Sequence, residues 1–428
     1  MGVVVRLTIL LAVIAAAFFA YAWRSEIAPL ASSGTRREPA AFDPATVKRG
    51  AELAALGNCI SCHTRPSGES YAGGRPIDTP FGRIYAGNIT PDPATGIGTW
   101  PQAAFVRAVR EGVSRDGRHL YPAFPYDHMT RMSEADVKAV YAFVMSRKPA
   151  QSTTPANELK FPYNVRMLVA GWKLLFFDRG EFRSDGAKSI ELNRGAYLVE
   201  GLAHCGACHT PRNSFGAEDK ANAYAGGEAS GWTAPALNAA SPAAVPWTAE
   251  RLYDYLRTGS SALHGVAAGP MAPVVQNLAA VPDADLKAIA AYVASVAGTP
   301  GKERLEQADK VVARAKGEAV PRTAGPTTGG VIYAGACAQC HGEAGRAPLT
   351  PALNLALSST VRANTPNNLI RVILDGLRPI DNTHGAIMPG FGSVLGDKQV
   401  ADLVDYLRAG FTDRPAFAAV DPVVRAAR

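Results

Sequence analysis

The chain has 428 residues, of which 47% are hydrophobic and 19% charged, with 41 Gly and 31 Pro. This length allows about three domains of ~100–200 residues, and the composition is that of a globular protein rather than a disordered one. The formal net charge is +7, but Lys and Arg are spread along the chain. The charge therefore indicates a solvated basic surface and does not support a nucleic-acid-binding protein.

The N-terminus begins with an apolar segment. Seventeen residues without a charge, Leu7 to Trp23, lie between Arg6 and Arg24. A helix of this length roughly matches a bilayer core of ~30 Å if its flanks help. The length of the run and the interfacial Trp23 favour an uncleaved membrane anchor, while an A-Y-A sequence at residues 20–22 leaves a cleaved export signal as the alternative. Both readings predict that the rest of the chain is exported.

All six cysteines fall in one repeated motif, C-x-x-C-H, at residues 59–63, 205–209 and 337–341. Two thiols of such a motif add to the vinyl groups of one porphyrin, and the histidine binds the iron from the proximal side. A thioredoxin-like pair does not need the histidine, zinc sites need cysteine pairs in twos, and disulfides leave three histidines unexplained. The motifs therefore predict three covalently attached haems c. The predicted attachments are Cys59, Cys62, Cys205, Cys208, Cys337 and Cys340, and the predicted proximal ligands are His63, His209 and His341.

The sequence around each motif is repeated, with domain-sized periods of 146 and 132 residues between the first cysteines. Each copy opens with a short helical pattern and closes with an amphipathic helix. Phe143, Tyr292 and Tyr406 occupy matching positions in the closing helices, and we expect them to pack against the opening helix of their own copy. The predicted N-caps of the closing helices are Ser133, Asp283 and Asp397.

The repeat predicts a mainly α-helical fold of three tandem cytochrome c-type domains with long loops and slight sheet content. The apolar bridge between the first two domains is expected to pack between domains, or else to face a partner subunit or the membrane. The linker before the third domain contains a charged helix that we expect to be solvated. The predicted segments are 1–24 (anchor or signal), 43–149 (domain 1), 150–189 (apolar bridge), 190–297 (domain 2), 298–329 (linker), 330–411 (domain 3) and 412–428 (tail).

Two copies offer a methionine as the second axial ligand of an iron. Met388 lies 47 residues after His341, and Met271 lies 62 residues after His209, both in loops rich in Gly and Pro. A methionine in such a loop lacks a packing reason, so both are predicted distal iron ligands. In the first copy the equivalent residue is Phe124, which cannot bind iron. The candidates near it are Met132, His128, Met129 and, further upstream, His119.

The three haem motifs occur together with FGRIYAGNITPDPATGIGTW at residues 81–100, HLYPAFPY at 119–126, and the loops GPMAPV and MPGFG. With these features the chain, from about Asp43 to Phe411, resembles the membrane-bound, three-haem cytochrome c subunit of bacterial periplasmic dehydrogenases. The resemblance implies a non-catalytic electron-transfer subunit. A quinoprotein, flavin or molybdenum-containing subunit oxidises the substrate, and electrons pass through the cytochrome subunit to ubiquinone or a terminal oxidase. The resemblance also implies the cysteine, histidine and methionine ligands named above.

Members of the alcohol dehydrogenase type have YPAMPY where this chain has YPAFPY, so the distal ligand of the first haem does not carry over. The Phe version looks more like subunits paired with molybdenum hydroxylase-type aldehyde or nicotinate dehydrogenases. Some of these have a Met just ahead of the closing helix, which makes Met132 the first candidate, before His128, Met129 and an open site. The alternatives are a hydrophobic staple from Met132 onto Val137 and a solvated loop role for His128.

Two other functions fit the same motifs. A peroxidase-like haem enzyme would need an open iron in the first copy, with an acid/base pair and an Arg above it. A cytochrome subunit of a terminal oxidase would keep the electron transfer but change the complex. For each function we expect the chain on the periplasmic side of the inner membrane.

Overall fold

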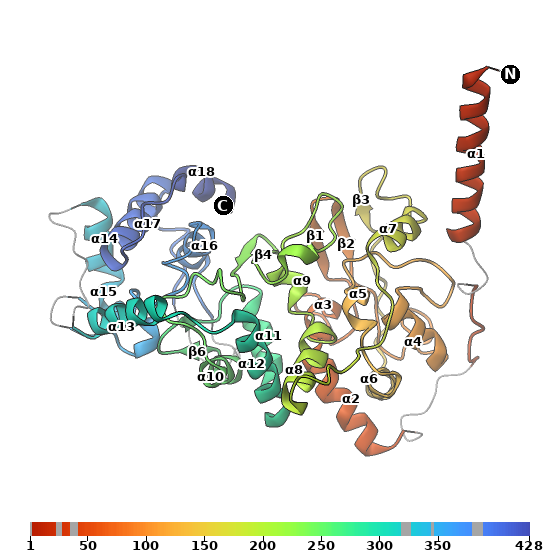
Figure 1. The fold of residues 1–428 in the computed structure, drawn as a ribbon, viewed down its shortest axis with the longest axis horizontal. Helices are drawn as coiled ribbons and strands as arrows, with labels where there is room; N and C mark the ends of the chain where they lie inside the picture. The colour runs from red at the N-terminus through yellow and green to blue at the C-terminus, as the bar shows by residue number, and fades with distance from the viewer. Residues whose placement is uncertain (1, 23–27, 35–41, 318–326, 344–345, 379–387) are drawn as a thin grey trace. The chain divides into compact units, whose positions relative to one another are not determined.

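The structure is a computed structural model, and it describes residues 2–22, 28–34, 42–317, 327–343, 346–378 and 388–428. The chain divides into two compact units. The first comprises residues 1–186, 197–204 and 214–217, and the second comprises residues 187–196, 205–213 and 218–428. Helices dominate both units and the strands are two to four residues long, which confirms the mainly helical fold with slight sheet content (Figure 1).

The first unit contains the N-terminal apolar helix, the first haem motif and part of the predicted bridge. Its elements are α1 (Val3–Ala22), α2 (Pro44–Leu56), α3 (Cys59–His63), β1 (Pro76–Thr79), β2 (Gly82–Tyr85), α4 (Gln102–Glu111), α5 (Tyr126–Met129), α6 (Glu134–Met145), β3 (Glu158–Leu159) and α7 (Leu168–Phe176). Local sequence explains where α2 begins, because Asp43 accepts a hydrogen bond from the Thr46 N–H at 2.8 Å and Pro44 suits the first helical position.

The second unit contains the other two haem motifs. Its elements are α9 (Gly206–His209), η3 (Lys220–Asn222), β4 (Gly227–Ala229), β5 (Trp232–Ala234), α10 (Ala249–Thr258), β6 (Ser260–Ser261), β7 (Gly265–Val266), α11 (Met271–Leu278), α12 (Asp283–Ala297), α13 (Lys302–Gly317), α14 (Thr328–Ala336), α15 (Ala338–His341), η4 (Pro351–Leu353), α16 (Asn367–Asp375), α17 (Asp397–Phe411) and α18 (Val420–Ala427). The strands pair as two antiparallel ribbons, β4 with β5 and β6 with β7. The ribbons are too short to form a sheet core, so helices supply it.

Each copy of the repeat has an opening helix that crosses its closing helix at a glycine. The opening helices are α2, α8 (Ile190–Glu200) and α14, and the closing helices are α6, α12 and α17. A Cβ placed on Gly50, Gly195 or Gly329 would lie 1.9, 2.1 and 2.1 Å from a carbonyl oxygen of the closing helix. The same Cβ would lie 2.6–2.8 Å from the Cβ of Phe143, Tyr292 or Tyr406. The expected packing of these aromatic residues on the opening helices is therefore confirmed.

Only the first of the three predicted N-caps is correct. Ser133 caps α6 and accepts a hydrogen bond from the Asp136 N–H at 3.2 Å. The caps of α12 and α17 are Pro282 and Gly396, one residue before the predicted aspartates. In α12 the carboxylate of Asp283 instead accepts hydrogen bonds from Arg257 and Tyr253, which keeps it away from the helix end. In α17 the Gln399 side chain accepts the hydrogen bond from the Gly396 N–H at 2.9 Å.

The linker before the third copy forms the expected charged helix, α13, but this helix is not solvated on all sides. Its Ala308, Val311 and Ala315 lie in the core of the third copy together with residues of α14 and α17. These residues recur at the spacing of one helix face, which a count of charges overlooks. The tail also folds, because α18 buries Val420 and Val424 in the same core.

The apolar bridge folds onto the first unit. Its strand β3 extends the hairpin of β1 and β2 into a three-stranded antiparallel sheet, with Gly82 opposite Leu159. Its helix α7 buries Val169 and Ala170. The leucines of the same helix are exposed, so only part of the bridge is explained by packing within this unit.

Candidate haem sites

Each of the three C-x-x-C-H motifs folds as a single helical turn, in α3, α9 and α15. The His N–H donates to the carbonyl of the first Cys at 3.0 Å in the second and third motifs. Such a turn places two residues that are three apart on the same side of the backbone. The two thiols of each motif are therefore presented together, with the histidine directly after them.

Each of the three motif histidines makes the same kind of hydrogen bond. The Nδ1 atoms of His63, His209 and His341 lie 2.7, 2.7 and 2.8 Å from backbone carbonyl oxygens. A carbonyl only accepts, so Nδ1 carries the proton and Nε2 keeps its lone pair. This is the arrangement of a metal-ligating histidine, whose second nitrogen donates to a fixed acceptor. The accepting carbonyls, which the sequence did not reveal, belong to Gly87, Pro235 and Leu353.

The six cysteines form no disulfide among the described residues, although each pair shares one turn. Burial raises the pKa of the Cys59 thiol to about 12 and that of Cys337 to about 11, which keeps both protonated. Burial also lowers the pKa of all three motif histidines, which keeps their imidazoles neutral. A neutral imidazole is the form that binds iron, so the residues present fit haem c.

The predicted distal methionines lie at comparable places in the second and third copies. Met388 pairs in an antiparallel bridge with Leu377, the residue directly after the glycine that ends α16. Met271 is not in a loop, as expected, but is the first residue of α11, where Pro270 occupies the cap. Proline is tolerated at a helix start, which explains why a Gly/Pro-rich sequence is helical here. Both methionines are half-buried.

The structure places Phe124 in the position of Met271. In the first copy the Leu120 N–H donates to the carbonyl of Gly112, the residue that ends α4, at 2.7 Å. In the second copy the Ala267 N–H donates to the carbonyl of Gly259, which ends α10, at 2.8 Å. Phe124 lies four residues after Leu120, and Met271 lies four residues after Ala267. The backbone hydrogen bonds of the two copies therefore align Phe124 with Met271, as the sequence did.

The candidate ligands of the first copy differ in their surroundings. His119 uses both ring nitrogens, Nδ1 with Lys173 Nζ at 3.2 Å and Nε2 with the Ala22 carbonyl at 3.3 Å, so its role is structural. His128 is buried, which makes the solvated loop role wrong, and its Nδ1 lies 3.0 Å from the Glu200 carbonyl. Met129 and Met132 are both buried. Val137 is buried as well, so a staple from Met132 stays open.

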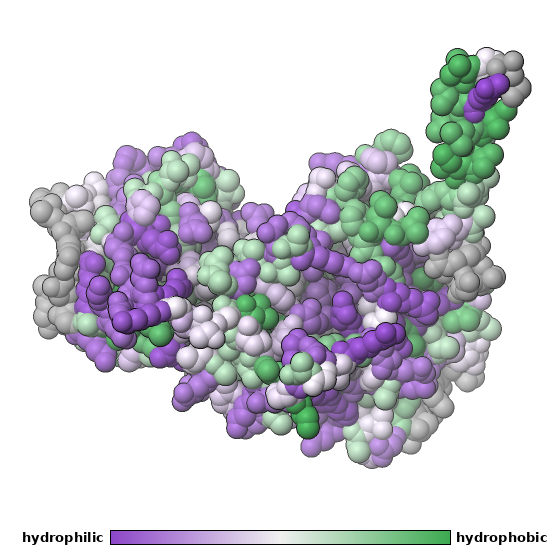
Figure 2. Space-filling view, viewed as in Figure 1, coloured by the Kyte–Doolittle hydropathy of each residue, from purple (hydrophilic) through white to green (hydrophobic). Residues whose placement is uncertain are grey.

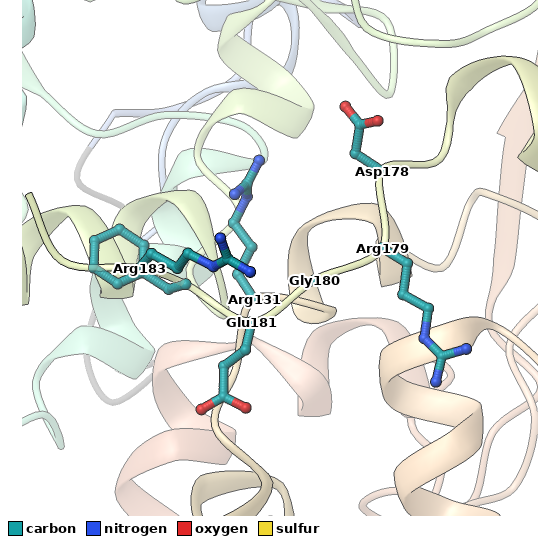
Figure 3. A pocket seen from close by; sticks show the side chains of 7 residues that line it. Arg131, Asp178, Arg179, Gly180, Glu181 and Arg183 are labelled. Atoms are coloured by element: carbon teal, nitrogen blue, oxygen red, sulfur yellow. The ribbon is translucent and has the colours of Figure 1, made fainter.

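A pocket of about 350 Å³ lies next to this loop, where residues 178–183 pass Arg131 (Figure 3). Its lining is charged and largely exposed, and Arg179 and Glu181 form ion pairs with Glu111 and Arg110 of α4. The pocket contains none of the predicted iron ligands. It is therefore not a candidate haem site.

A c-type cytochrome is defined by such C-x-x-C-H turns, whose neutral histidines keep Nε2 available for a metal. Two family models agree: "Cytochrome c" matches residues 47–148, and "Cytochrome C oxidase, cbb3-type, subunit III" matches residues 324–407. The chain belongs to the family of cytochrome c subunits of dehydrogenase complexes, and its role is electron transfer. The resemblance drawn from the motifs is thereby confirmed.

Three relatives show how far the similarity extends. A nicotinate dehydrogenase subunit of Pseudomonas putida is 46% identical over 92% of the chain, and the chain spans 32% of its length. The fructose dehydrogenase cytochrome subunit of Gluconobacter japonicus is 35% identical over 92% of the chain and 86% of that protein. A diheme cytochrome c-type protein of Cereibacter sphaeroides is 40% identical over 58% of the chain and 85% of that protein. Dehydrogenase subunits thus match nearly the whole chain, whereas the oxidase model matches one copy of the repeat.

Proposed function

We propose that the chain carries three haems c and transfers electrons from the catalytic subunit of a periplasmic dehydrogenase to ubiquinone in the membrane or to a terminal oxidase. The observation that carries the proposal is the threefold recurrence of one site, a C-x-x-C-H turn whose histidine gives Nδ1–H to a backbone carbonyl. Haem c supplies a one-electron couple when bound. In each copy the two thiols of the motif would hold the haem covalently, and the histidine Nε2 would bind its iron.

The number of haems is tested by alkaline pyridine spectra against protein concentration. Three haems per chain are expected, from the pairs at Cys59, Cys205 and Cys337. Combining Cys205→Ala with Cys208→Ala should leave two. A count of two in the unaltered chain would contradict the proposal, and a relative named as a diheme cytochrome makes this measurement necessary.

For the distal positions we propose Met271 in the second copy, Met388 in the third and Met132 in the first. Met132 is buried and lies three residues after the end of the short helix α5, which follows Phe124. One observation favours His128 as the second candidate: its Nδ1 approaches a carbonyl in the same way as the three motif histidines do. Met129, also buried, is the third candidate.

The near-infrared Fe–S(Met) absorption distinguishes these ligands. If Met132 is the ligand, Met132→Ala removes about a third of the absorption, while His128→Ala and Met129→Ala leave it intact. If His128 is the ligand, the unaltered chain shows the absorption of two haems, and Met132→Ala changes nothing. The effect of Met132→Ala on the absorption therefore decides between Met132 and His128.

We propose that α1 is a retained anchor rather than a cleaved signal. The helix is long and apolar enough to cross a membrane, a property it shares with signal sequences. Its last residue is built into the first unit, because Ala22 is 2% exposed and its carbonyl lies 3.3 Å from His119 Nε2. The intact mass of the mature protein tests this: a chain that starts after Ala22 would refute it.

For the partner we propose a molybdenum hydroxylase-type dehydrogenase that acts on an aldehyde or an N-heterocycle. YPAFPY in place of YPAMPY supports this class, as does the 46% identity to a nicotinate dehydrogenase subunit. Purification of the native membrane complex in mild detergent tests it, since the cofactor of the large subunit names the class. Copper oxidase subunits in that complex would instead support the terminal oxidase alternative.

The rival function, a peroxidase-like enzyme, requires an iron in the first copy that is open to small ligands. Carbon monoxide titration of the reduced protein at native pH distinguishes the two. We expect no binding, because the loop that follows Phe124 offers three buried ligand candidates, His128, Met129 and Met132. Binding by about a third of the haem would refute pure electron transfer for this copy.

A further inference from the structure

Helix α7 buries Val169 and Ala170, but the places of its charged residue and of its leucines are unusual for a helix on the surface of a soluble domain. Its only charged residue, Lys173, is buried and 7% exposed. The two residues that follow it, Leu174 and Leu175, are 64% and 70% exposed. A surface helix normally turns leucines inward and lysines toward water. The exposed leucines of α7 therefore indicate a surface that contacts an apolar partner.

This orientation of α7 is stable because Lys173 is fully satisfied inside the first unit. Its Nζ donates to the carbonyls of Glu111 and Gly112 at 2.6 and 2.7 Å and lies 3.2 Å from His119 Nδ1. These carbonyls end α4, where a positive charge also interacts favourably with the helix dipole. The leucines cannot turn inward unless these bonds break.

Other exposed apolar side chains surround the helix. Figure 2 shows a hydrophobic area over α7 and the segment before it. We call this set the α7 patch, and it comprises Phe161, Tyr163, Leu168, Leu174, Leu175 and Phe215. Exposed apolar groups gathered in this way usually mark a contact surface.

The charged side chains of the bridge segment are bound to the first unit. Between Phe161 and Phe177 the charged residues are Arg166, which donates to the His119 carbonyl at 2.9 Å, and the buried Lys173, and none is acidic. Tyr163 and Trp172 add the amphipathic aromatic rings that occur at membrane interfaces. Exposed leucines together with such aromatic rings are typical of the apolar face of an interfacial membrane helix.

The α7 patch is continuous with the anchor helix. A Cβ on Gly171 of α7 would lie 3.2 Å from the ring of Phe18 in α1, so the two helices are in close contact. The Ala22 carbonyl, His119 and Lys173 form a hydrogen-bonded chain from the end of α1 into α7. The last turn of α1, where a membrane-spanning helix would leave the bilayer, therefore lies against α7.

We propose that α7 lies in the headgroup region of the bilayer with the α7 patch inserted among the lipids, so that the first unit rests on the membrane surface. This proposal depends on α1 being retained as an anchor. It specifies a second, interfacial contact that fixes the orientation of the first haem site to the membrane.

The test measures thiol reactivity in vesicles of phosphatidylethanolamine and phosphatidylglycerol. Haem attachment consumes the six native cysteines, so an introduced cysteine is the single free thiol, and the unaltered chain reports any failure of attachment. Leu175→Cys probes the patch, and Leu349→Cys in the third copy is the matched control, with 65% exposure against 70%. A water-soluble maleimide should modify Leu175→Cys at least about tenfold more slowly than Leu349→Cys, because thiolates are disfavoured in an apolar medium.

A third variant separates this proposal from the anchor. Val13→Cys lies within α1 and should be protected wherever α1 spans the bilayer. Protection of Val13→Cys together with full reactivity of Leu175→Cys would overturn the α7 proposal and leave the anchor intact. Protection of Leu175→Cys that appears only after addition of the dehydrogenase subunit would also overturn it, since the patch would then bind a protein.

Discussion

The glycines at the helix crossings should respond to alanine in the opposite way from a neighbouring glycine in the same helix. Gly329 and Gly335 both lie in α14. A Cβ on Gly329 would sit 2.1 Å from the Asp402 carbonyl oxygen, well inside van der Waals contact, whereas a Cβ on Gly335 has no atom within 4 Å. The same change, glycine to alanine, at these two positions therefore separates the effect of the close approach from the effect of helix propensity.

We expect Gly329→Ala to lower the free energy of unfolding by about 1–3 kcal/mol, because overpacking forces α14 and α17 apart. Gly335→Ala should raise it by up to about 1 kcal/mol, the difference in helix propensity between alanine and glycine. Denaturant titration of the haem-loaded protein, followed by helix circular dichroism and haem absorption, measures both. Equal shifts of the same sign would refute the view that the crossing depends on a missing side chain.

Three further results are expected. Lys173→Met should destabilise the first unit by about 1–3 kcal/mol, since it removes the ammonium group that donates to the Glu111 and Gly112 carbonyls, whereas Lys160→Met at an exposed position should change unfolding by less than about 0.5 kcal/mol. Burial lowers the pKa of His264, which stacks on Trp247, to about 3, so stability should fall as the pH drops below about 6.5 toward 3. At pH 5 this loss is about 2 kcal/mol, and His264→Phe should remove it; an unchanged pH profile in denaturant titrations would show that another group is responsible. Met271→Ala and Met388→Ala should each remove about a third of the near-infrared Fe–S(Met) absorption, and a variant that keeps the full signal excludes its methionine as a ligand.

The sequence predicted the parts of the site that depend on local spacing. Two thiols and a histidine within one turn need only their order in the chain, so the C-x-x-C-H motifs were readable directly. The match between Phe124 and Met271 was also readable, because both follow a helix, a glycine and a hairpin of similar length. The aromatic residues of the closing helices were predicted by helical periodicity.

The remaining features depend on contacts between segments that are distant in the sequence. The carbonyls of Gly87, Pro235 and Leu353 follow their histidines by 24, 26 and 12 residues, and nothing in a side-chain pattern marks a backbone acceptor. The burial of Lys173 was missed because its partners lie about 60 residues earlier in the chain. Asp283 was misplaced as a cap because Arg257 competes for its carboxylate.

The hydrogen bonds at the three motif histidines have a consequence for how these sites can change. Their acceptors are main-chain oxygens, so no side-chain substitution at Gly87 or Pro235 deletes the acceptor itself. With haem bound, the electron donation from each imidazole would depend little on side-chain substitution at these acceptors. The distal ligand and solvent access would then be the main ways to set the copies apart, and the short loop around Phe124 is where the first copy departs from the second.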